Sequence, residues 1–124
     1  MGRKILPATL ALLLLLPSCA TLKPHPEPWN KTDKILAVYF IAGHTADAYT
    51  TERCLDHPDR FYEKNRILGK HPKDHEIVAY FSVTGVGALL IAHLYPELRP
   101  WLLGAYGSVG FYCAHHNYHL LHDR

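Results

Sequence analysis

The sequence predicts an all-α protein, either a three-helix bundle or a helical membrane domain, behind a proline-rich tether. Three long apolar stretches begin near residues 32, 77 and 101, and each is too long for an ordinary strand. Prolines and charged residues separate the stretches. Hydrophobic residues make up 48% of the 124 residues and charged residues 19%, which excludes a disordered chain.

The net charge of +2 gives no reason to expect nucleic acid as a partner. Proteins that bind a phosphate backbone carry clustered basic side chains. Two of the positive charges, Arg3 and Lys4, lie at the start of the chain, so the remainder is close to neutral. A length of 124 residues predicts one folded domain.

Residues 1–18 have the pattern of a signal peptide. Arg3 and Lys4 precede a short apolar run, Leu10 to Leu16. The segment that follows, ending in Cys19, resembles the lipobox of bacterial lipoproteins, in which this cysteine is acylated and becomes the new N-terminus. The resemblance implies a palmitate-type lipid anchor at Cys19 and bacterial membrane lipid as a partner.

Residues 19–31 form the lipidated N-terminus and the tether. Pro24, Pro26 and Pro28 alternate with other residues, and proline disfavours helix in the residue before it. We expect an extended segment that carries the folded part a little away from the lipid surface.

The helical domain is expected over residues 32–124. Thr32 or Asp33 can cap a first helix that runs to about Arg53. Asp74 is the expected cap of a second helix, in which residues 77–95 carry no formal charge. After two prolines, a third helix is expected from Trp101 to about Leu121.

Two environments fit these helices. The second is apolar on nearly all sides, and the third contains small residues that permit close packing in membranes: Gly104, Gly107, Ser108 and Gly110. These features favour a membrane. The first and third helices have fewer clearly apolar residues than the ~20 that a full span needs, which favours a periplasmic bundle.

An up-down-up arrangement brings many polar residues to one pole. His44, Asp47 and Thr51 form one stripe on the first helix. Glu63 and Asn65 lie in the charged loop that closes the same pole. A carboxylate such as Asp47 is expensive within an apolar helix, so we expect it to have a partner.

Histidines near the end of the third helix suggest a metal site. His115 and His119 are spaced to chelate from one helix face, and His44 and Asp47 could complete the set. Imidazole and carboxylate suit zinc or another divalent transition metal. The alternative is a polar rim or a buried hydrogen-bond network that uses the same side chains.

The chain resembles a group of small uncharacterised membrane-associated proteins from proteobacteria and their prophages. The motifs that carry the resemblance are His44-Thr-Ala-Asp47 with Thr51, the segment 63–72 (Glu-Lys-Asn-Arg-Ile-Leu-Gly-Lys-His-Pro), Ala79-Tyr-Phe81 and His116-Asn117. The resemblance implies a helical membrane-associated protein without an established activity, and it favours His116 and Asn117 as the late pair. Asn117 lies about 160° around the helix from His119, so both sets stay open.

The function that fits best is a small lipid-anchored protein of the bacterial cell envelope with a structural or interaction role. The alternative is a metal-dependent or acid–base membrane enzyme that uses the polar pole. The sequence does not specify whether the anchor lies in the inner or the outer membrane. If the helices span the inner membrane, the charged loop lies in the cytoplasm, and the six Lys and Arg in residues 53–73 agree with that side. Cys54 and Cys113 would then stay reduced, whereas a periplasmic pole would permit a disulfide.

Overall fold

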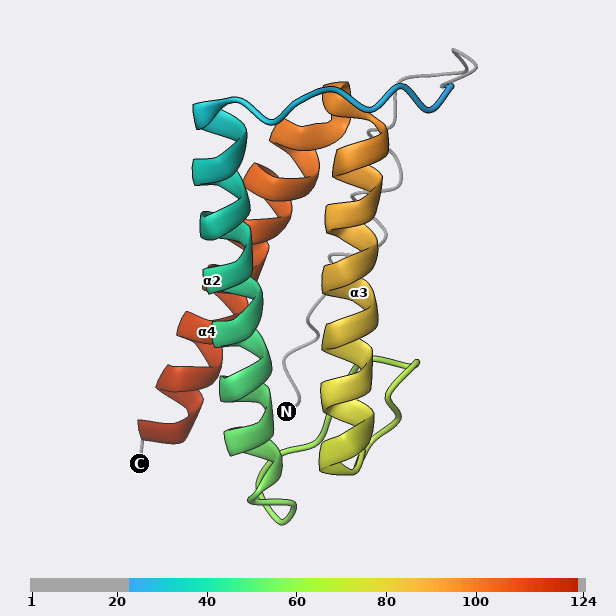
Figure 1. The fold of residues 1–124 in the computed structure, drawn as a ribbon. Helices are drawn as coiled ribbons and strands as arrows, with labels where there is room; N and C mark the ends of the chain where they lie inside the picture. The colour runs from blue at the N-terminus through green and yellow to red at the C-terminus, as the bar shows by residue number, and fades with distance from the viewer. Residues whose placement is uncertain (1–22, 123–124) are drawn as a thin grey trace.

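The computed structural model describes residues 23–122 and consists of three long helices that run side by side (Figure 1). They are α2 (Lys31–Leu55), α3 (Asp74–Leu94) and α4 (Tyr106–His122). No strand occurs in this part of the chain, so the predicted all-α fold is confirmed. The signal peptide and Cys19 lie outside the described residues.

The helices alternate in direction, as expected. The end of α2, the start of α3 and the end of α4 meet at one pole, which we call the loop pole because it carries residues 56–73 (Figure 1). The start of α2, the end of α3 and the connection to α4 meet at the other, which we call the Arg99 pole. α2 and α4 are therefore parallel neighbours, and α3 is antiparallel to both.

The caps of α2 and α3 differ from the predicted ones. Asn30, rather than Thr32 or Asp33, caps α2: its side chain accepts from the backbone N–H of Asp33 at 2.9 Å, and the Asp33 carboxylate accepts from the N–H of Asn30 at 3.0 Å. This reciprocal pair satisfies two N–H groups that a helix start leaves without partners. Lys73 occupies the cap position of α3, and Glu76 accepts its N–H at 2.7 Å.

The connection between α3 and α4 is wound more irregularly than predicted. Residues Pro96–Leu98 form a 3₁₀ turn, η1, and Pro100–Ala105 form a π-helical segment, η2. The N–H of Tyr106 reaches the carbonyl of Trp101, five residues back. The helical winding thus begins at Pro100, one residue before the predicted Trp101, and its first turns are wider than those of an α-helix.

Glycines bring α2 and α4 into backbone contact. A Cβ atom added to Gly110 would lie 2.6 Å from the carbonyl carbon of Gly43, and one added to Gly43 would collide with the carbonyl oxygen of Gly107. A Cβ atom added to Gly107 would lie 3.0 Å from the Cα of Phe40. The predicted close packing is confirmed for Gly107 and Gly110.

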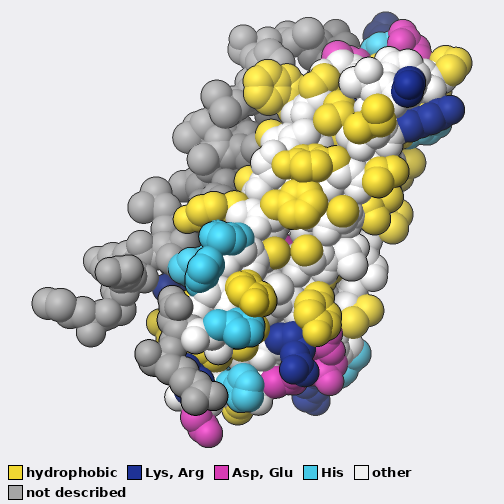
Figure 2. Space-filling view, turned by 90° about the vertical axis from the view of Figure 1, so that its left-hand side faces the viewer, with side chains coloured by type: hydrophobic (Ala, Val, Ile, Leu, Met, Phe, Trp, Pro, Cys, Tyr) yellow, Lys and Arg dark blue, Asp and Glu magenta, His cyan; other side chains and the backbone are white. Residues whose placement is uncertain are grey.

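The buried core is small, while many large apolar side chains are exposed. Phe40, Leu103, Ala88 and Ala92 form the core. Figure 2 shows hydrophobic side chains over the middle of one face, with charged side chains gathered towards its two ends. Among residues 23–122, α3 alone is long and apolar enough to cross a membrane, with a mean hydropathy of 1.9 over a window that is 22% buried.

Candidate functional site

His44 lies between α2 and α3 in a closely fitted position. Its Nε2 lies 2.8 Å from the carbonyl oxygen of Phe81, a distance that fits donation from the ring N–H, and 3.3 Å from the hydroxyl of Thr84. The imidazole ring stacks on Phe40 at a centroid distance of 5.2 Å. Gly85 leaves room for it, since an added Cβ would lie 3.0 Å from the ring. His44 therefore joins two helices through its ring nitrogen.

Asp47, Thr51 and Asn117 form a chain of polar contacts from α2 to α4. The Thr51 hydroxyl lies 3.4 Å from Asp47 Oδ1, to which it donates. The Asn117 side-chain amide donates to Thr51 Oγ1 at 3.2 Å and to Thr50 Oγ1 at 3.3 Å. The structure thus brings Asp47 together with the partners that its place in an apolar helix requires.

Glu63 and Asn65 shape the charged loop with their own side chains. Glu63 Oε1 accepts the N–H groups of Lys64 and Asn65, both at 2.8 Å, and Asn65 Oδ1 accepts that of Ile67 at 3.0 Å. Gly69 closes the turn with a φ of 77°, which favours glycine. The quoted loop motif is therefore a turn-forming motif. It also brings the Glu63 carboxylate within electrostatic range of Asp47.

The predicted metal site is not formed. His115 and His119 are exposed on the outer side of α4, where their rings contact each other at 4.4 Å between centroids. Asn117, two residues from each, faces α2, so the helical period turns both histidines away from His44 and Asp47. Among residues 23–122, no group of three or more His, Cys, Asp or Glu side chains is arranged to hold a metal ion.

The resemblance implies His116 and Asn117 as site residues, and only Asn117 contacts the polar side chains of α2. Asn117 contacts α2, whereas its neighbour His116 is half-buried and belongs to none of the contacts that link the helices. Asn117 is thus the residue of α4 that joins Asp47 and Thr51.

Cys54 and Cys113 carry free thiols. The Cys54 thiol lies 3.6 Å from the carbonyl oxygen of Asn117, to which it donates, and Asn117 follows Cys113 by one helical turn. The two cysteines are therefore staggered along the α2–α4 contact. Burial and the nearby Glu63 carboxylate raise the pKa of Cys54, so this thiol stays protonated at neutral pH.

Sequence reasoning gave no structural role to Arg99, which is 3% exposed. Its guanidinium donates to Asp33 Oδ2 at 2.8 Å and to the carbonyl oxygens of Ala92 and Glu27 at 2.9 and 2.7 Å. It also lies over the ring of Trp29 at 4.9 Å from the centroid. We call this set of contacts the Arg99 clamp. The only sequence signal for it is a lone cation between two prolines, Pro96 and Pro100.

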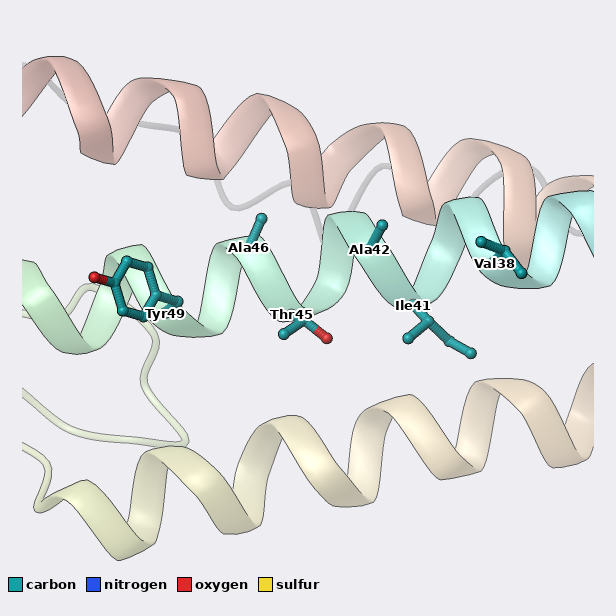
Figure 3. Close-up of a pocket in the computed structure, with 6 residues that line it drawn as sticks. All are labelled: Val38, Ile41, Ala42, Thr45, Ala46 and Tyr49. Carbon is teal, nitrogen blue, oxygen red and sulfur yellow. The ribbon is translucent and has the colours of Figure 1, made fainter.

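An apolar hollow of about 620 Å³ lies on the outer face of α2 (Figure 3). By helical period this face is opposite to the one that carries His44, Asp47 and Thr51. The hollow therefore does not open onto the polar contacts. Its lining residues are Val38, Ile41, Ala42, Thr45, Ala46 and Tyr49.

Comparisons of the chain with protein-family models, with curated proteins and with solved structures found no match.

The polar contacts between the helices form two sets, which we together call the polar network: His44 with α3, and Asp47, Thr51 and Asn117 between α2 and α4. Within the described part of the chain, each buried side-chain nitrogen or oxygen has a hydrogen-bond partner. Imidazole, carboxylate, hydroxyl and amide groups are thus directed at one another. Such a network holds helices in register, which matters most where the surroundings offer no competing water.

Proposed function

We propose that this chain is a small lipoprotein of the bacterial cell envelope, anchored through Cys19, whose helices lie within the lipid. In this proposal the polar network holds the helices together, and the role is structural or one of interaction rather than catalytic. The observation that carries it is the distribution of side chains: polar groups bond one another between the helices, and large apolar side chains face outward.

The outward-facing side chains support this placement on all three helices. Val38 is 68% exposed on α2, Val83 is 71% exposed on α3, and Tyr112 is 70% exposed on α4. A water-soluble bundle places polar residues at such positions. An outer surface of this kind is energetically favourable when acyl chains cover it.

The charges of the helices lie near their ends, with one exception. Residues 77–95 and 100–122 contain no Asp, Glu, Lys or Arg, and residues 35–51 contain Asp47 alone. At 1.5 Å per residue, stretches 35–51 and 77–95 are about 26 and 28 Å long, close to the ~30 Å of a hydrocarbon core. The exception is Asp47, and its carboxylate accepts from the hydroxyl of Thr51 one turn along the same helix.

The polar network supports the structural role over the enzymatic alternative. A catalytic site needs groups that can reach a substrate, but the imidazole of His44 and the amide of Asn117 are engaged with other helices. Their contacts join α2 to α3 and α2 to α4, which is what the stability of an embedded bundle requires.

Two measurements test the proposal. Bacteria that express the full chain are labelled with a tagged fatty acid, and we expect label on the wild type and none on Cys19→Ser. In the second, residues 1–19 are replaced by a cleavable signal without a lipobox, and membranes are washed with alkaline carbonate. Embedded helices keep the unlipidated chain in the membrane pellet. Release into the supernatant would contradict embedding and favour a periplasmic bundle.

A further inference from the structure

The tether is bound to the Arg99 pole along its described length. Its residues 23–30 form no helix, as predicted, but they lie across this pole instead of extending away from it (Figure 1). Arg99 donates to the carbonyl oxygen of Glu27 at 2.7 Å. The indole N–H of Trp29 donates to His93 Nδ1 at 3.2 Å. The tether is therefore held against the folded helices by hydrogen bonds.

The same contacts fix where the tether leads. From the start of α2 it crosses to the end of α3, and the described chain begins beyond α3, on the side away from α2 (Figure 1). There the N–H of His25 donates to the carbonyl oxygen of Leu94 at 3.0 Å. The His25 ring also lies 3.3 Å from the Glu97 carboxylate. These contacts hold His25 beside the last turn of α3, and the His25 ring in turn contacts the carbonyl oxygen of Lys23 at 2.9 Å.

Three residues lie between Cys19 and Lys23, and a fully extended chain covers at most about 14 Å over these four residue steps. We infer that the acyl chains attached to Cys19 lie along the half of α3 nearest the Arg99 pole. This inference rests on the proposed lipid anchor. The short chain between Cys19 and Lys23 restricts the acyl chains to surfaces close to Lys23. We therefore assign the lipid anchor, rather than another ligand, to this part of α3.

The surface available there fits acyl chains. Val86, Leu90 and Ile91 are 66%, 54% and 42% exposed on this half of α3. Acyl chains gain free energy from apolar contact area and need no polar partner. A control surface on α2 lies at a similar distance along the helix from the Arg99 pole. It consists of Ile35 and Val38, which are 59% and 68% exposed.

Photo-cross-linking tests this placement on the full chain in membranes. Cells incorporate a diazirine-bearing fatty acid, membranes are irradiated, and mass spectrometry counts only cross-links that join a residue to the lipopeptide containing Cys19. We expect a several-fold excess at Val86, Leu90 and Ile91 over Ile35 and Val38. Equal counts, or an excess on α2, would overturn the inference. If the wild type carries no acyl label at all, the lipid anchor itself fails, which is a separate result.

A lengthened chain is the matched control. About six Gly and Ser residues inserted between Cys19 and Lys23 more than double the reach of the anchor without touching the folded part. Loss of the preference for α3 in this variant supports placement by the docked tether. An unchanged preference would show that the tether does not set the position of the acyl chains.

Discussion

Replacing Gly110 by alanine tests the backbone contact between α2 and α4. The new Cβ atom would lie 2.6 Å from the carbonyl carbon of Gly43, whereas non-bonded carbons sit about 3.5–4.0 Å apart. The helices must therefore separate by about 1 Å, because the obstructing atoms are backbone and cannot rotate away. Overpacking costs about 1–3 kcal/mol, and alanine returns up to about 1 kcal/mol of helix propensity. We expect a net loss of about 1–2 kcal/mol.

Gly87→Ala is the matched control for this substitution. Gly87 is also a helix-interior glycine, but an added Cβ would meet no atom within 4 Å. Without a collision, only the propensity gain remains, and we expect stabilisation of about 0.5–1 kcal/mol. Unfolding by SDS titration in mixed micelles, followed by circular dichroism, measures both variants. Equal free energies of unfolding for the two would refute the close approach of α2 and α4.

Three further predictions concern side chains at the two poles. Asp33→Ala leaves a buried guanidinium without its anion and should lower the free energy of unfolding by about 3–5 kcal/mol. Asp47→Ala removes the acceptor of a half-buried network and should cost about 1–3 kcal/mol. Asp59→Ala, on the exposed loop, is the control for both and should stay within about 0.5 kcal/mol; similar losses in all three would contradict these roles. Because the Cys54 thiol contacts Asn117, one helical turn beyond Cys113, non-reducing mass spectrometry should find no peptide that links the two cysteines, and a linked peptide would show that the α2–α4 register is wrong.

The sequence was sufficient for the number, direction and approximate limits of the helices. Charge-free runs separated by prolines identify helices regardless of how they pack. Cap positions were less certain, because Asn30, Thr32 and Asp33 are all good caps, and the pairing of Asn30 with Asp33 decides between them. Local pattern shows that a helix starts here but does not rank neighbouring cap residues.

The candidate site was predictable only where one helix contained the partners. Asp47 and Thr51 are one turn apart, so their contact follows from spacing alone. Spacing on α4 could not show which of its faces points inward, and the metal hypothesis failed because His115 and His119 lie on the outer side. The ion pair of Arg99 and Asp33 joins residues 66 positions apart, which no local pattern specifies.

The parallel pairing of α2 and α4 has a consequence for the order of assembly. The backbones of the two helices are in contact, yet residues 56–105 are synthesised between them. Chains form from the N-terminus, and contacts between distant segments form late. During synthesis α2 therefore precedes the helix that supplies Asn117, and the Asp47–Thr51 pair lacks that amide until α4 is complete. Chains that stop before residue 106 would leave the glycine face of α2 without its partner, so the stability of the first helix depends on the last one made.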